Sequence, residues 1–192
     1  ILSSCNNNDK NLVSAYWTDP DHTIHVNGVD GDDTKKVIKQ LNDNIKKLSQ
    51  KLDDTLIIIS ADHGAVDVEE IYLNEIPEIN DCLLKPPSIE SRFVSFFLKK
   101  DKKELFLKNI NKYSKDEFLI FEHDEFLKSG LLGRGVIHSR INDYIGDYVL
   151  IAKGNINLRY AQGNSSNSYH VADHGGISIQ EMNVPIILIN TK

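Results

Sequence analysis

Residues 33–64 read DTKKVIKQLNDNIKKLSQKLDDTLIIISADHG and decide the fold class. Over residues 33–52 the apolar side chains recur at steps of three and four, which predicts an amphipathic helix. Residues 55–60 then form a continuous apolar run, as expected of a central strand that is covered on both faces. A polar segment that holds an aspartate and a histidine follows this strand at once.

Upstream of that helix, residues 12–17 (LVSAYW) look like a short buried strand that ends in a polar break. A strand, a helix and a second strand make a βαβ unit. The sequence therefore predicts an α/β fold with a mostly parallel sheet flanked by helices.

The rest of the chain is expected to add shorter elements. Residues 1–88 and 161–192 form the predicted metal-binding α/β core, and residues 89–160 form a small inserted α+β lobe. Further strands are expected at 92–98, 118–121, 148–152 and 184–189, helices at 101–113 and 124–129, a capping box at Ser178 and Glu181, and a polar loop at 163–168.

Composition limits the possible functions. The chain has 192 residues, 40% of them apolar, which is enough for the core of one ordinary domain. Lys and Arg number 22 against 28 Asp and Glu, and this net charge of -6 disfavours a nucleic-acid surface or an anionic-membrane anchor. No apolar run reaches the roughly 18 residues of a membrane-spanning helix. Two cysteines, Cys5 and Cys82, are too few for a cysteine-rich zinc site or a disulfide framework.

Aspartates and histidines gather in three places, at residues 21–25, 62–64 and 170–176. The first two clusters follow predicted strands, whose carboxyl ends meet at one crevice in a parallel sheet, and the third precedes the last strand. Carboxylate oxygen and neutral imidazole nitrogen together favour zinc, with manganese or iron as alternatives.

Each cluster alone has a plainer interpretation. Asp62 could cap a helix, and His63 could be a half-buried histidine with its hydrogen bonds satisfied. The three clusters together favour a metal site. We interpret His22 as a solvated loop residue and Asp173 as a residue that orients His174. His170 could join His174 on a metal, but the family resemblance described next implies no ligand at that position, so we leave it out.

The same stretches resemble a known family. Residues 16–28 (YWTDPDHTIHVNG) are similar to the Pro-Asp-x-x-Gly-His-x-x-Gly segment of the type I phosphodiesterase/nucleotide pyrophosphatases, which belong to the alkaline phosphatase superfamily. Residues 57–64 (IIISADHG) resemble the Ser-Asp-His-Gly strand end of that family, and residues 174–185 resemble its final His-Gly…Val-Pro element. The order of the motifs agrees from about residue 12 to the end.

The resemblance implies a phosphoester hydrolase with two divalent metal ions, zinc first and manganese as the alternative. Asp21, His25 and His174 would hold one ion, and Asp62 and His63 would supply part of the second site. Two such ions clamp the attacking and leaving oxygens of an in-line displacement. The implied substrate is a small phosphorylated compound such as a nucleotide.

The family also places a metal-binding aspartate and a Thr or Ser nucleophile upstream of the first motif, and no matching segment precedes Leu12. We therefore expect the chain to be the C-terminal part of a larger enzyme, with the N-terminal segment of the same protein as its partner. We expect the chain alone to bind one metal at best and to be inactive. The alternatives are a sulfatase-like or phosphonate hydrolase of the same fold, a non-catalytic metal-binding module, and a plain α/β interaction domain.

Overall fold

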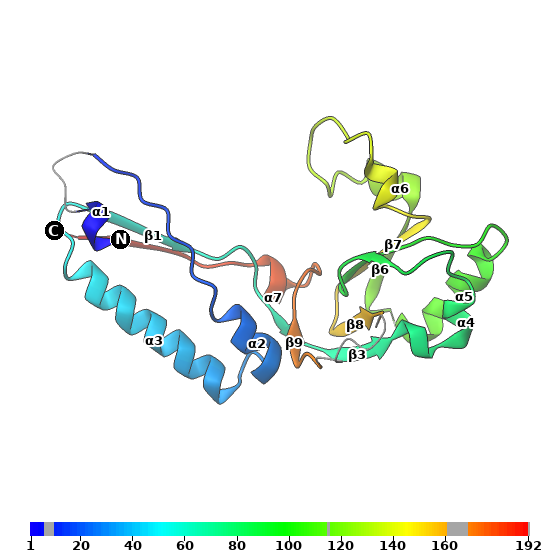
Figure 1. The fold of residues 1–192 in the computed structure, drawn as a ribbon, viewed down its shortest axis with the longest axis horizontal. Helices are drawn as coiled ribbons and strands as arrows, with labels where there is room; N and C mark the ends of the chain where they lie inside the picture. The colour runs from blue at the N-terminus through cyan, green and yellow to red at the C-terminus, as the bar shows by residue number, and fades with distance from the viewer. Residues whose placement is uncertain (6–9, 115, 161–168, 192) are drawn as a thin grey trace.

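The structure, a computed structural model, describes residues 1–5, 10–114, 116–160 and 169–191. The polar loop predicted at 163–168 lies outside these residues. Figure 1 shows an elongated arrangement, with a long helix and a two-stranded ribbon at one end, a compact lobe at the other, and both termini at the far end of the ribbon. Within the described ranges, no helix is both long and apolar enough to cross a membrane.

The amphipathic helix predicted over 33–52 is confirmed as α3 (Asp32–Ser49). Two aspartates in its first turn and two lysines in its last turn complement the helix dipole. The short helices α1 (Leu2–Cys5) and α2 (Asp21–Asn27) precede it. The hydroxyl of Thr34, which is buried, donates to the carbonyl of Gly28 at 2.8 Å and fixes the turn between α2 and α3.

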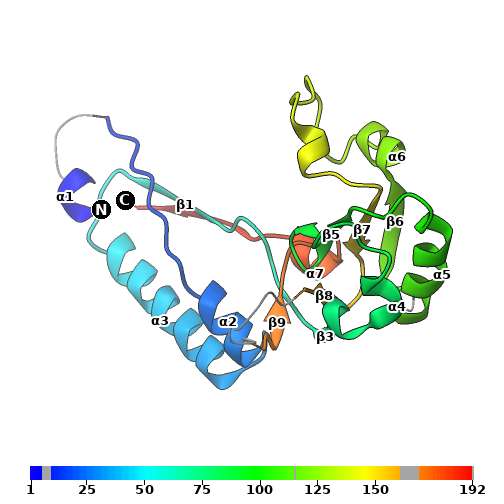
Figure 2. The ribbon, with the colours of Figure 1, turned by 45° about the vertical axis from the view of Figure 1, so that its right-hand side comes forward.

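The predicted central strand forms as β1 (Leu56–Ser60), but its surroundings differ from the expectation. It pairs with β10 (Ile186–Asn190) in antiparallel register, with Ile58 opposite Leu188. Both of these side chains are 63% exposed, so β1 is not covered on both faces. β1 and β10 form a two-stranded ribbon (Figure 2). The exposed side chains of Ile58 and Leu188 give this ribbon an open apolar face.

The strand predicted at residues 12–17 is wrong. This segment is irregular, and Leu12 and Trp17 are 99% and 64% exposed. A strand needs a neighbouring strand for its backbone hydrogen bonds, and no described strand pairs with this segment. The βαβ unit therefore does not form in the described chain.

The lobe is built on an antiparallel sheet of order β4-β5-β7-β6. Phe96 and Phe106 have no exposed surface and pack between this sheet and helix α5, with their ring centroids 4.8 Å apart. The elements of this lobe are η1 (Leu73–Glu75), α4 (Pro77–Asn80), β4 (Ser88–Ile89), β5 (Phe93–Phe96), α5 (Lys103–Ser114), β6 (Phe118–Glu122), α6 (His123–Lys128), η2 (Ile141–Asp143) and β7 (Tyr148–Ala152).

Short strands link the lobe to the ribbon. β2 (Val66–Asp67) pairs antiparallel with β9 (Ala172–Asp173), and β3 (Glu69–Tyr72) pairs parallel with β8 (Ile156–Arg159). The latter is the one parallel pair among the strands of the described ranges. The chain is α/β as predicted, but the mostly parallel sheet is not confirmed.

The main hydrophobic core lies inside the lobe. It joins side chains of residues 73–83 to those of the antiparallel sheet and of β8. The division of the chain at residues 88/89 and 160/161 stays a prediction.

The core and the ribbon should respond differently to the loss of a large side chain. We expect Phe96→Ala to lower the free energy of unfolding by about 3–5 kcal/mol, because the cavity cannot close in a packed core. Leu188→Ala on the open ribbon should cost less than about 1 kcal/mol. Urea unfolding followed by circular dichroism measures both, and equal losses would contradict this account of where the core lies.

Candidate metal centre

Helix α2 places Asp21 and His25 on one face because they are four residues apart. The carboxylate Oδ1 of Asp21 lies 3.4 Å from Nε2 of His25. His174 directly follows β9, and its Nε2 lies 3.5 Å from the same Asp21 oxygen. Two of the three predicted clusters therefore meet at one carboxylate oxygen.

These distances exceed the 2.7–3.2 Å of ordinary N–H···O hydrogen bonds. They match instead the edge of a tetrahedron around a small cation. With ligand bonds of about 2.0–2.1 Å, two ligands of a tetrahedral zinc ion lie about 3.3–3.4 Å apart. The pairs Asp21–His25 and Asp21–His174 each have about that spacing. One group of three whose ligand atoms all lie within 4.8 Å of one another joins Asp21, His63 and His174.

A backbone hydrogen bond fixes the orientation of His25. Its Nδ1 lies 2.8 Å from the carbonyl oxygen of Ala172. Because a carbonyl oxygen only accepts, Nδ1 carries the proton, and Nε2 of the neutral ring is left with a lone pair toward Asp21. This is the arrangement by which proteins usually orient a metal-ligating histidine.

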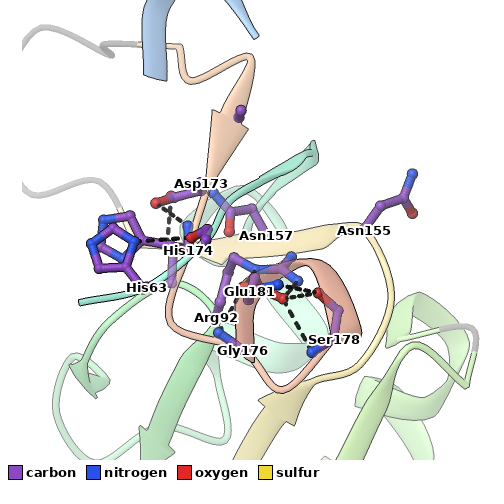
Figure 3. A network of polar contacts seen from close by, with 12 residues as sticks. His63, Arg92, Asn155, Asn157, Asp173, His174, Gly176, Ser178 and Glu181 are labelled. Carbon is purple, nitrogen blue, oxygen red and sulfur yellow. Dashed lines mark hydrogen bonds and ion pairs between the residues drawn. The ribbon is translucent and has the colours of Figure 1, made fainter. Parts of the chain in front are cut away.

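Asp62 and His63 follow β1 after a single residue, Ala61. The His63 ring stacks on the His174 ring with centroids 3.7 Å apart, and its Nδ1 donates to the carbonyl of Gly64 at 2.9 Å. Nε2 of His63 lies 3.8 Å from Oδ1 of Asp62. The structure thus brings all three predicted clusters to one place, and Figure 3 shows His63 beside His174.

The surroundings of His174 favour its neutral form, which can bind a cation. Burial lowers the pKa of His174 below its usual 6.5, and the adjacent His63 lowers it further, against the opposing effect of Asp173 and Asp21. The ring is therefore neutral at neutral pH and presents a lone pair.

Asp173 acts on His174 through the backbone. Its Oδ1 accepts from the His174 amide at 2.9 Å, and its Oδ2 accepts from Asn157 at 2.6 Å and from Ser91 at 3.0 Å. Burial alone would raise the pKa of Asp173, but these hydrogen bonds and the nearby His25 lower it below the usual 3.8. The carboxylate is ionised and holds the backbone of His174, which is consistent with the orienting role predicted from the sequence.

His170 was set aside in the sequence analysis, yet it lies close to the centre. Its ring is 4.5 Å from the His25 ring, and its Nδ1 is 3.4 Å from Oδ2 of Asp173. His25, His170 and Asp173 are close enough to hold an ion together. The Nδ1 of His25 already donates to Ala172, however, and the Asp173 oxygens are engaged, so we interpret this group as hydrogen-bonded support for the centre.

A cleft of about 340 Å³ opens beside the histidines and has the size of a small-molecule site. Ile89 at its rim has φ 76°, a left-handed conformation that is strained for a β-branched residue. Glu90 lines both this cleft and a second one beside Asp62 and His63. Sequence reasoning missed Glu90 because its hairpin has no metal-ligand pattern. The cleft is lined by His25, Pro87, Ser88, Ile89, Glu90, Ser91, Val94, Leu158, Arg159, Tyr160, His170, Asp173 and His174.

Comparison with known proteins identifies the family of the chain. The model of the family "Type I phosphodiesterase / nucleotide pyrophosphatase" matches residues 3–177. The chain belongs to this family, within the alkaline phosphatase superfamily. None of the curated proteins matches it.

Solved structures share the fold. Human ectonucleotide pyrophosphatase / phosphodiesterase 5 is 19% identical with a TM-score of 0.65, and the match covers 90% of this chain and 45% of that one. The murine protein, inactive and in complex with AMP, is 20% identical with a TM-score of 0.69, covering 98% and 49%. Phosphonoacetate hydrolase from Sinorhizobium meliloti is 17% identical with a TM-score of 0.57, covering 88% and 43%. The chain spans about half the length of the structures that it matches.

The neutral state of His174 gives a testable pH dependence. Because the folded chain lowers the pKa of His174, the unfolded chain binds its proton more readily below about pH 6.5. The contribution of His174 to stability is thus complete above pH 6.5 and is lost as the pH falls from there toward the folded-state pKa. We expect His174→Gln to flatten this part of the curve of unfolding free energy against pH, measured with chelator present. An unchanged slope would contradict the environment described for His174.

Proposed function

We propose that this chain carries the metal-binding half of a phosphoester hydrolase. The observation that supports this proposal is the single Asp21 oxygen at 3.4 and 3.5 Å from two imidazole nitrogens whose rings come from distant parts of the chain. The family match supports the reaction class, because the named members hydrolyse phosphodiester and pyrophosphate bonds.

In this proposal Asp21, His25 and His174 hold one divalent cation, with zinc favoured by the carboxylate and imidazole donors. A divalent cation bound there neutralises negative charge on a phosphoryl group. The chain's own residues orient the ligands: Ala172 fixes the proton of His25, and Asp173 holds the backbone of His174.

Asp62 and His63 are the proposed ligands of a second cation. They supply two donors, whereas zinc takes four ligands. Both point into a cleft that is shared with Glu90, and the side chain of Asp62 is 63% exposed. We propose that a further carboxylate and the nucleophile come from polypeptide upstream of Ile1.

The exposed face of the β1–β10 ribbon supports the proposal that an upstream segment completes the site. Its open face carries Leu56, Ile58, Ile186 and Leu188, which are large, apolar and exposed. Soluble proteins rarely leave such a continuous apolar patch on a pair of unprotected strand edges. β1 ends at Ser60, two residues before Asp62, so a parallel strand added beside β1 would bring its own end loop to the incomplete second site. The upstream half is the occupant that fits both the apolar face and the missing ligands.

We propose a nucleotide-type phosphodiester as the substrate. One structural neighbour is in complex with AMP. The cleft beside His25 and His174 also offers apolar and aromatic surface from Pro87, Ile89 and Tyr160, on which a nucleoside can pack. A phosphonate is the second candidate, because another neighbour is a phosphonoacetate hydrolase.

Metal analysis tests the first site. We expect the purified chain to bind about one equivalent of zinc, and His25→Ala or His174→Ala to lower the affinity at least tenfold because each removes a ligand. His22→Ala is the matched control, since His22 lies on the same helix but is exposed. Equilibrium dialysis with metal quantification measures the stoichiometry. Absence of bound metal after loading with zinc or manganese would refute the site.

Activity measurements test the proposal that the upstream polypeptide supplies the nucleophile and a further metal ligand. We expect the chain alone, loaded with zinc, to hydrolyse a nitrophenyl ester of thymidine monophosphate at or near the background rate. Co-expression with the polypeptide encoded upstream should restore a rate that chelator abolishes. A chelator-sensitive rate from the chain alone would show that the second site is complete. Faster turnover of phosphonoacetate than of the nucleotide ester would favour the second candidate.

A further inference from the structure

Arg92 and Glu181 form a buried ion pair behind the candidate metal centre (Figure 3). Arg92 has no exposed surface, and its Nε and Nη2 donate to the two carboxylate oxygens of Glu181 at 2.6 and 2.8 Å. The guanidinium also donates to the backbone carbonyls of Gly154 at 2.6 Å and Ile156 at 3.1 Å. Arg92 is therefore fixed to the lobe and holds Glu181 in one orientation.

The Glu181 side chain in turn holds the loop that carries His174. Its Oε1 accepts from the amide of Gly176 at 2.8 Å, and its Oε2 accepts from the hydroxyl of Ser178 at 2.6 Å. Burial alone would raise the pKa of Glu181, but Arg92 and Ser178 lower it below the usual 4.5, so the group is a carboxylate. Gly176 is two residues beyond His174, and this contact limits where the His174 ring can lie.

The main chain of the same residue holds the other loop. The carbonyl of Glu181 accepts from the amide of Gly64 at 2.8 Å, and Gly64 directly follows His63. A Cβ atom on Gly64 would lie 1.9 Å from the carbonyl oxygen of Gln180, so this loop packs directly on the backbone of helix α7 (Ile179–Met182). One residue, Glu181, thus joins the His63 loop to the His174 loop.

We propose that Arg92 and Glu181 are positioning residues that set the distance between His63 and His174, and through them between the two metal sites. The metal part of this inference rests on the proposed function, whereas the ring contact of 3.7 Å exists without any ion. A role in folding alone is the competing explanation. It is separable, because replacing a whole buried ion pair by apolar side chains is often neutral for stability.

The decisive variant removes both charges. We expect Arg92→Met with Glu181→Leu to lower the urea midpoint less than either single substitution, because no lone charge stays buried although the Gly154, Ile156 and Gly176 backbone groups lose their partners. We expect its zinc dissociation constant to rise about 10- to 100-fold, as for other groups that orient ligands, and the visible spectrum of the cobalt-loaded chain to change. The matched control replaces the exposed pair Arg140 and Asp143 by Met and Leu and should leave both readouts unchanged.

A milder variant keeps the test valid where the double variant does not fold. Ser178→Ala removes one hydrogen bond to Glu181 and retains the ion pair, and it should weaken zinc binding about two- to fivefold. Zinc affinity within twofold of the wild type and an unchanged cobalt spectrum, in whichever variant folds, would overturn the proposal.

A metal-free measurement separates this inference from the proposed function. Wild-type chain in chelator should show nuclear Overhauser contacts between the ring protons of His63 and His174, and the folded variant should lose them. If the wild type binds no metal, the proposed function fails while this test still stands. Retention of the ring contacts in the variant would refute the positioning role.

Discussion

The buried carboxylate of Glu181 is the group on which the arrangement of the site depends. Its two oxygens and its backbone carbonyl together accept hydrogen bonds from the lobe, from the His174 loop and from the His63 loop. A buried carboxylate is stable only while its lone pairs are satisfied. Each of the three segments is therefore held at a fixed place relative to the others. The stacking of the His63 and His174 rings follows, because the loops that carry them are both hydrogen-bonded to Glu181.

Local sequence patterns predicted local structure well. The periodic spacing of Val37, Leu41, Ile45 and Leu48 was enough to define α3, and the Ser178–Glu181 pair correctly indicated a capping box at α7. Both features depend on residues within a few helical turns of one another. The pairing of β1 depends instead on a strand that is distant in the sequence. Its apolar run is equally compatible with a covered parallel strand and with the exposed antiparallel ribbon that it forms with β10. Residues 12–17 failed for the same reason, since strand formation depends on a partner elsewhere in the chain.

In the candidate site, too, short motifs could be predicted from the sequence and contacts between distant residues could not. The three Asp- and His-containing clusters could be recognised because each is a short motif, and the structure brings them together. The residues that support them could not be recognised in this way. Arg92 precedes a strand in the lobe, Asn157 lies within another, and neither lies in a pattern that points to Asp173 or Glu181. Side chains that orient ligands are chosen by distance in space, and a single sequence does not record that distance.

The open ribbon has a consequence for handling the protein. Among the described strands, β1 and β10 pair only with each other and leave one aliphatic face uncovered. Such a pair is a template for further strands, including those of another copy. Self-association of the chain at high concentration would then be expected to run through these two strands. The apparent molecular mass of the chain should therefore be measured at several protein concentrations. The buffers of the metal-binding experiments should contain an additive that limits aggregation.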